Sequence, residues 1–241
     1  LNEDGTIGEM TDEVFHKGIG SVAERNFRPH VNCVNITPDQ KYLCAVDLGV
    51  DQVKIYKFND ETGKITLVDM LRCELESAPR IIKFSPDGRF AYLICELKNY
   101  ISVYSYKDGP RGPVFELVQT ISTLNEYHSK GSAACVLRFS RDWNYVLCSN
   151  AGDNSVGIFK IDRETGMLEK ICILPVSGDY PKAADFFPDN RHIMALNHES
   201  NTMTIFRINY EKKYFSLWGK PLKVETPNCV LVSEIEEAPK Q

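Results

Sequence analysis

The chain has no apolar run close to the roughly 20 residues that a transmembrane helix requires, and it has no excess of positive charge. Its 241 residues include 28 Lys and Arg against 33 Asp and Glu, which gives a formal net charge of −5. Proteins that bind nucleic acid or anionic membranes through charge present a basic surface. The composition therefore predicts a globular protein with neither nucleic acid nor membrane among its partners.

Familiar catalytic and metal-binding motifs are missing as well. The sequence contains no C-x-x-C pair, no G-x-S-x-G elbow, no P-loop, no G-x-G-x-x-G fingerprint and no H-E-x-x-H helix. A serine hydrolase, a nucleotide-binding enzyme and a zinc protease therefore have no support. We expect no metal and no cofactor.

The eight cysteines lie mostly among Val, Ile and Leu in strand-like runs. Cysteine in such surroundings behaves as a small apolar residue. The chain is long and starts with neither a basic nor an apolar leader, unlike the small secreted domains that depend on disulfides. The pattern predicts reduced, buried thiols and a cytoplasmic location.

One turn motif recurs along the chain. In S-P-D-G at residues 85–88, Pro86 fixes φ, the aspartate side chain can bond to the backbone ahead of it, and Gly88 tolerates a positive φ. Related turns occur three more times, with their aspartates 48, 55 and 47 residues apart. The four turn aspartates are Asp39, Asp87, Asp142 and Asp189.

Each of these turns joins two predicted strands, and helical periodicity is nearly absent. First strands are expected at residues 31–36, 81–84, 135–139 and 183–186, and second strands at 42–47, 90–96, 145–150 and 192–197. Strongly alternating third strands are expected at 52–56, 101–104, 155–159 and 203–206. Fourth strands follow glycine turns, for example at 65–68 and 167–170. Four short strands per repeat of about 40–50 residues are typical of a β-propeller blade.

We interpret residues 1–241 as a single all-β domain built of four-stranded antiparallel blades. Four repeats are expected at about 29–77, 78–132, 133–180 and 181–225. Residues 1–28 are interpreted as a remnant of an earlier blade, 226–232 as the inner strand of a closing blade and 233–241 as a tail. An open ring leaves an unpaired blade face, so we expect an N-terminally truncated part of a larger propeller. Roughly 100 further N-terminal residues, the missing blades of the same polypeptide, would complete it.

Several short motifs carry a resemblance to a known family. They are P-H-V-N at 29–32, D-L-G-V-D at 47–51, A-P-R at 78–80, S-P-D-G-R-F-A-Y at 85–92, C-E-L at 95–97, S-N-A-G at 149–152 and P-N-C-V at 227–230. In this order they resemble the lactonase family of seven-bladed propellers, which contains bacterial 6-phosphogluconolactonases and fungal muconate-lactonising cyclases. The resemblance covers nearly the whole chain and implies a seven-bladed ring.

The resemblance implies a site in a cleft at one end of the central channel. It assigns His30 to the family's Pro-His element, Arg80 to its Pro-Arg element and Glu96 to its Asn-Glu-Leu element. Opening a lactone requires a base, a proton donor for the alkoxide and donors for the oxyanion or an anionic substituent. We expect Glu96 to act as base, His30 as acid or oxyanion donor and Arg80 as anion anchor. The residues expected to contact substrate are Lys182, Asn150 and His198.

Four positions depart from the family pattern. Asn32 and Ile81 stand where histidines are common, Ala151 stands where Ser-Asn-Arg-Gly has its arginine, and Lys182 replaces the arginine of a further Pro-Arg element. Lysine keeps the charge without the planar fork. Three functions therefore stay open. They are hydrolysis of a sugar-derived lactone such as 6-phosphoglucono-lactone, a non-catalytic scaffold that binds a partner, and a lactone-forming cyclase or isomerase.

Four other polar residues are expected to have structural or surface positions rather than a role in the site. Asp47 and Asp51 are expected to bond to the backbone of blade loops rather than to a metal. His16 and His128 are expected at the surface, although a long loop around His128 could fold over the channel.

Overall fold

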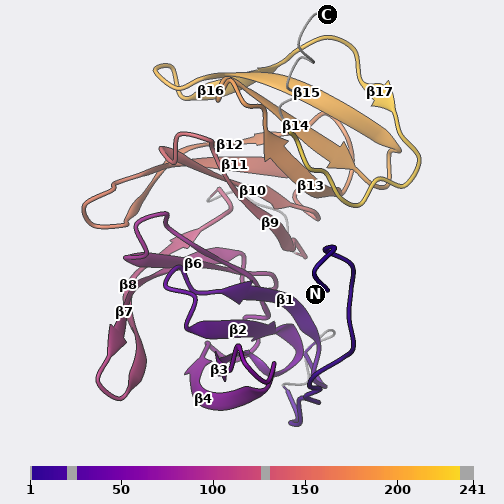
Figure 1. Ribbon diagram of the computed structural model, residues 1–241. Coiled ribbons are helices and arrows are strands. Elements are labelled where there is room, and N and C mark those ends of the chain that lie inside the picture. The colour runs from indigo at the N-terminus through magenta and orange to yellow at the C-terminus, as the bar shows by residue number, and fades with distance from the viewer. Residues whose placement is uncertain (1, 21–25, 126–130, 234–241) are drawn as a thin grey trace, which may run out of the picture.

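The computed structural model describes residues 2–20, 26–125 and 131–233. Within these ranges the regular structure consists of strands and one short 3₁₀ helix, η1 (Leu48–Val50). The strands form four antiparallel sheets that follow one another as blades and fan out in space (Figure 1). No helix among these residues is long and apolar enough to cross a bilayer. The predicted all-β architecture of four-stranded propeller blades is confirmed.

Each blade runs from an inner to an outer strand in chain order. The first blade contains β1 (Val31–Ile36), β2 (Tyr42–Asp47), β3 (Gln52–Phe58) and β4 (Ile65–Arg72). The second contains β5 (Pro79–Phe84), β6 (Phe90–Cys95), β7 (Tyr100–Gly109) and β8 (Gly112–Ser122). The third contains β9 (Ala134–Phe139), β10 (Tyr145–Asn150), β11 (Ser155–Ile161) and β12 (Leu168–Pro175). The fourth contains β13 (Pro181–Phe186), β14 (His192–Asn197), β15 (Thr202–Asn209) and β16 (Tyr214–Leu217), and β17 (Leu222–Lys223) also pairs with β15.

The inner half of each blade agrees closely with prediction, whereas the outer strands extend further than predicted. β1, β2, β10 and β14 have the predicted bounds, and β6 ends one residue early, at Cys95. β3 continues through Lys57 and Phe58, whose side chains are exposed although the backbone still pairs with β4. The burial of side chains along β3 therefore stops before its backbone pairing with β4 ends.

The recurring turns have the predicted chemistry. In the second blade the Gly88 N–H donates to the carbonyl of Ser85 over 3.0 Å, and Asp87 Oδ1 accepts from the Arg89 N–H over 3.1 Å. Gly88 has a φ of +72°, and the matching residue of the third blade, Trp143, has a φ of +55°. The turn thus needs a left-handed residue, which glycine supplies without strain.

Both end segments differ from the predicted blade fragments. Residues 226–232 contain no strand; Arg138 Nη2 and Arg141 Nη2 donate to the carbonyls of Val230 (3.4 Å) and Val232 (2.6 Å). Residues 2–20 form the predicted turn around Gly5, whose φ is +82°, but they too contain no strand. Residues 234–241 of the predicted tail, and His128, lie outside the described residues.

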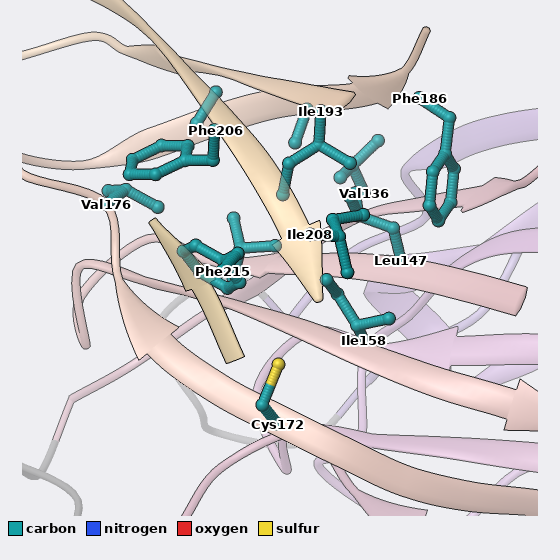
Figure 2. Packing of buried hydrophobic residues seen from close by; sticks show 13 residues of the cluster. Val136, Leu147, Ile158, Cys172, Val176, Phe186, Ile193, Phe206, Ile208 and Phe215 are labelled. Atoms are coloured by element: carbon teal, nitrogen blue, oxygen red, sulfur yellow. The ribbon is translucent and has the colours of Figure 1, made fainter. Parts of the chain in front are cut away.

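Neighbouring blades pack face to face, and each large apolar cluster spans two of them. The cluster between the third and fourth blades includes Leu147, Ile158, Ile193 and Phe206, all at most 2% exposed (Figure 2). Similar clusters join the first blade to the second and the second to the third. Burying a side chain of this size contributes about 1.5–3 kcal/mol. These interfaces fix the angle between blades and therefore where the inner strands converge.

Truncating a buried leucine tests how much this interface contributes to the free energy of unfolding. Leu147 is fully buried, whereas Leu231 is 83% exposed. We expect Leu147→Ala to lower the free energy of unfolding by about 2–5 kcal/mol, because it removes transfer energy and leaves a cavity. The matched control Leu231→Ala is expected to change it by less than about 0.5 kcal/mol. Urea unfolding measures both, and equal effects would contradict the assigned interface.

The thiols are largely buried, as predicted. Cys44, Cys95, Cys135, Cys148 and Cys172 are buried, Cys33 and Cys73 are partly exposed, and Cys229 is exposed. Burial raises the pKa of the Cys44, Cys95 and Cys148 thiols to about 12. Reactive thiolate is therefore scarce at these positions near neutral pH.

Alkylation of the native protein should follow this order. With iodoacetamide at pH 8, Cys229 is expected to be modified first, and Cys44, Cys95 and Cys148 only after unfolding, since their thiols are both inaccessible and protonated. Mass spectrometry of tryptic peptides over time measures this. Rapid modification of Cys148 in folded protein would contradict its placement.

Candidate active site

One backbone hydrogen bond recurs at the same end of all four blades. The residue after the second strand donates its N–H to the carbonyl of the residue before the first strand, over 2.8–3.0 Å. The donor and acceptor pairs are Leu48 and His30, Glu96 and Ala78, Ala151 and Ala133, and His198 and Tyr180. Leu48, Glu96, Ala151 and His198 are therefore equivalent positions of the repeat.

A second set of equivalent positions lies at the start of each inner strand. The register between the first two strands slips there by one residue, which leaves an unpaired bulge residue. The bulge residues are Asn32, Arg80, Cys135 and Lys182. Each blade thus presents one bulge side chain and one side chain from the first set. The second blade presents Arg80 and Glu96, and the fourth presents Lys182 and His198.

The structure brings the three predicted catalytic residues to one pocket. This pocket has a volume of about 560 Å³, and His30, Arg80 and Glu96 all line it. Leu48 and the short segment before His30 complete the wall. The motifs that carry these three residues lie up to 66 residues apart in the sequence, so their meeting results from the packing of the first blade against the second.

Arg80 and Glu96 form a buried ion pair at the base of this pocket. Arg80 Nη1 bonds Glu96 Oε2, and Arg80 Nε donates to the carbonyl of Cys135 in the third blade over 2.9 Å. The Glu96 side chain is 1% exposed and that of Arg80 is 29% exposed. A carboxylate at such depth is costly unless it is paired, and here the guanidinium supplies the pairing. The guanidinium also has further N–H groups on its exposed side for an anionic ligand.

His30 lines the same pocket and lies in the loop that leads into β1. Its backbone N–H donates to Asp47 Oδ1 over 2.7 Å, and its carbonyl accepts from Leu48 over 3.0 Å. The residue is exposed, so its imidazole can reach solvent and ligand. The prediction that Asp47 and Asp51 bond to loop backbone is confirmed, since Asp51 Oδ1 accepts from the Ala78 N–H over 2.8 Å.

The three predicted substrate-binding residues lie elsewhere. Lys182 and His198 sit together in the fourth blade, where the Lys182 ammonium is 5.7 Å from the centroid of the Tyr180 ring. Lys182 Nζ donates to Asn228 Oδ1 over 3.3 Å, and His198 Nδ1 is 3.3 Å from the carbonyl oxygen of Pro227. Neither residue lines the pocket of Arg80 and Glu96. Their contact with substrate stays a prediction.

Asn150 is fully buried and has a structural environment. Its amide donates to the carbonyl of Thr123 over 2.8 Å and to Ser155 Oγ over 3.0 Å, which ties the second and third blades together. The Asn150 amide thus contributes to blade packing, and its predicted contact with substrate stays a prediction. Every residue of β10 after Tyr145 is buried.

Two of the four departures from the family pattern, Ala151 and Asn32, have local explanations. Ala151 and Cys135 are both buried in a small apolar cluster with Ala133, against which Tyr180 packs. The third blade therefore has an apolar pair where the second has Arg80 and Glu96. Asn32 donates instead to the carbonyl of Arg80 over 3.2 Å, which links the first two blades.

Sequence reasoning missed two residues near the pocket. Arg28 lines it and adds a second cation, and its only signal was its position just before the Pro-His element. His16 was expected at the surface, but its side chain is 4% exposed and bonds Asp47 Oδ2 over 2.6 Å. That expectation was wrong because residues 10–20 fold back over the first blade, where no local pattern predicts a partner 31 residues away.

The described residues contain no group of three or more His, Cys, Asp and Glu side chains placed to hold a metal ion. The predicted lack of a cofactor stays a prediction.

Comparison with known proteins gives a consistent result over the whole described chain. The family model described as "Lactonase, 7-bladed beta-propeller" matches residues 1–232. A 6-phosphogluconolactonase from Bacillus subtilis is 27% identical over 230 residues, which are 95% of this chain and 64% of that protein. A protein from Lactococcus lactis is 32% identical over 231 residues, covering 96% of this chain and 66% of that protein.

Solved structures agree with these sequence relatives. The periplasmic gluconolactonase of Pseudomonas aeruginosa matches with a TM-score of 0.86 at 26% identity, over 95% of this chain and 63% of that one. A protein from Lactobacillus plantarum matches with a TM-score of 0.82 at 28% identity, over 93% of this chain and 64% of that one. The chain thus spans a little under two thirds of the length of these relatives.

The two members of the buried ion pair should contribute unequally to the free energy of unfolding. Arg80→Met leaves the buried Glu96 carboxylate without its guanidinium and is expected to lower the free energy of unfolding by about 3–5 kcal/mol. Glu96→Gln should cost less, because the partly exposed guanidinium can be hydrated and keeps its bond to Cys135. Urea unfolding of the two variants measures the difference. A larger loss for Glu96→Gln would contradict the burial assigned to the pair.

Proposed function

The chain belongs to the lactonase family of seven-bladed β-propellers, and from this premise we propose that it hydrolyses a sugar-derived lactone in the pocket of His30, Arg80 and Glu96. The observation that carries the proposal is the meeting of an imidazole, a guanidinium and a buried carboxylate around one cavity of about 560 Å³. Together these groups can supply the base, the proton donor and the cationic donor that lactone opening uses.

We assign each group one role. Glu96 takes a proton from the attacking water, and the resulting hydroxide adds to the ester carbonyl. His30 donates a proton to the alkoxide that leaves when the ring C–O bond breaks. Arg80 orients Glu96 through Oε2 and offers its remaining N–H groups to the substrate's negative charge. The pocket needs no cofactor for this sequence of steps.

The charges of the pocket favour an anionic substrate. Arg28 and Arg80 both line it, and guanidinium groups bind phosphate through paired hydrogen bonds. We therefore propose 6-phosphoglucono-lactone, and we place the phosphate on the arginines and the lactone carbonyl toward Glu96. The names of the Bacillus and Pseudomonas relatives, a 6-phosphogluconolactonase and a gluconolactonase, support a substrate of this class.

One observation favours the scaffold as a second candidate. The third blade has the apolar pair Cys135 and Ala151 where the second has a charged pair, so it adds no charged side chain at these two positions. A scaffold would leave lactones intact, whereas a cyclase or isomerase on the same site would convert an unsaturated acid to a lactone. Turnover assays separate the three.

We further propose a cytoplasmic location, which agrees with the burial of most of the cysteines in the described chain. The Pseudomonas relative is named as periplasmic, so fractionation of the host cell decides the compartment.

Turnover by the full-length protein tests the proposed reaction. We expect kcat/KM for 6-phosphoglucono-δ-lactone to exceed that for glucono-δ-lactone by about tenfold or more, because charge-assisted hydrogen bonds to the phosphate contribute about 1.5–3 kcal/mol. Glu96→Gln should lower kcat by about 10²–10⁴-fold, as expected for a general base. The rate of lactone opening is measured against the spontaneous rate at pH 6.5.

A matched control variant tests whether the loss of kcat is specific to the site. Glu74, between β4 and β5, forms an ion pair with Lys98, but its side chain is 60% exposed and lies outside the pocket. Glu74→Gln is expected to leave kcat unchanged. Failure of the unaltered protein to open either lactone would reject the hydrolase and favour the scaffold.

A further inference from the structure

A buried histidine of the N-terminal segment lies directly behind the wall of the pocket. His16 Nδ1 is 2.6 Å from Asp47 Oδ2, and Tyr56 Oη is 3.0 Å from His16 Nε2. The His16 side chain is 4% exposed and that of Asp47 is fully buried. Because both ring nitrogens have partners, the imidazole is held in one orientation.

The second oxygen of Asp47 holds the pocket wall itself. Asp47 Oδ1 accepts from the His30 N–H over 2.7 Å and from the Gly49 N–H over 3.1 Å. His30 and Leu48, which line the pocket, are joined by the repeated backbone bond. One carboxylate therefore connects His16 on one side with two pocket-lining backbone segments on the other.

This arrangement is particular to the first blade. The residues that match Asp47 are Cys95, Asn150 and Asn197, and none of them has a carboxylate. Asn150 donates to Thr123 and Ser155, and Asn197 donates to Thr202 and Thr204, so neither holds the residue before the inner strand.

The second and fourth blades secure that residue in a different way. The N–H groups of Ala78 and Tyr180 donate to Asp51 Oδ1 and Asn154 Oδ1, each over 2.8 Å and each from the preceding blade. The fold therefore does not require a carboxylate at position 47. It is present in the blade that carries His30.

We propose that His16 and Asp47 are positioning residues, which hold the His30 loop at the distance from Glu96 that lactone opening requires. The inference rests on the proposed function, because it assigns His30 a role in turnover. In this account residues 10–20 are a strap across the first blade, and His16 is the point at which the strap contacts the site. Tyr56 fixes the orientation of His16.

Substitutions of His16 test the proposal. We expect His16→Ala to lower kcat for the lactone by about tenfold or more while KM changes little, because a displacement of about 1 Å can cost up to 10²-fold and the arginines that hold the substrate are untouched. His16→Asn places an amide N–H close to the position of Nδ1 and should restore most of the activity. His16→Gln, whose amide lies closer to the position of Nε2, should not.

Thr11→Ala is the matched control for the strap. Thr11 Oγ1 donates to the carbonyl of Gly63 over 3.1 Å at an exposed position, so its loss loosens the same segment away from the pocket. Unchanged kcat in this variant is expected. Equal activity of His16→Asn and His16→Gln, or equal losses in His16→Ala and Thr11→Ala, would overturn the proposal, and the comparison of the two amides decides if His16→Ala does not fold.

Hydrogen exchange separates this inference from the proposed reaction. In His16→Ala the amides of His30 and Gly49 should exchange faster, whereas the Glu96 amide, which bonds the Ala78 carbonyl, should exchange as before. If the unaltered protein opens no lactone but the exchange pattern is seen, the reaction is wrong and the positioning link stands. If turnover is present and exchange at His30 and Gly49 is unchanged, the positioning link is wrong.

Discussion

The site depends on a constraint that every blade obeys, the hydrogen bond from the residue after the second strand to the residue before the first. This bond fixes one position on the second strand against the start of the inner strand. The bulge at the start of the inner strand then directs a second side chain to the same end. Because the blades pack face to face, these two positions from neighbouring blades come together. In the second blade the bulge residue, Arg80, and the residue after the second strand, Glu96, are both charged, and this pair lines the candidate site.

The pair of Arg80 and Glu96 is distinguished by the burial of its carboxylate. The Glu96 carboxylate is almost wholly removed from water and is compensated by a guanidinium that keeps part of its own surface exposed. A buried pair of this kind is weak evidence for stability, since apolar side chains of the same volume would often serve equally well. Here the pair lines a pocket that the exposed His30 also lines, and we propose that it serves function there. The third blade shows the alternative, since Cys135 and Ala151 close the equivalent position with apolar packing.

Much of this could be predicted from the sequence. The spacing of Asp39, Asp87, Asp142 and Asp189 and the alternation of the strands predict the blades, because turn chemistry and side-chain alternation are local properties. The resemblance to the lactonase family predicted that His30, Arg80 and Glu96 would meet.

The sequence did not predict which way individual side chains point, or which residues far apart in the chain are in contact. Motif matching singled out Asn150 but did not show that its side-chain amide bonds Thr123 of the neighbouring blade. His16 and Arg28 carry no motif, and their placement depends on how residues 10–30 cross the first blade. The burial of Asp47, between His16 and His30, is the clearest result that only coordinates provide.

The central claim is that Arg80, Glu96 and His30 surround a bound phosphorylated sugar acid or lactone. A crystal structure of the full-length protein soaked with 6-phosphogluconate, the product of the proposed reaction, tests it most directly. The account predicts the phosphate on Arg80 and Arg28 and the carboxylate carbon facing Glu96 and His30. A product molecule bound at another end of the propeller, with the pocket of Arg80 and Glu96 filled only by solvent, would contradict it.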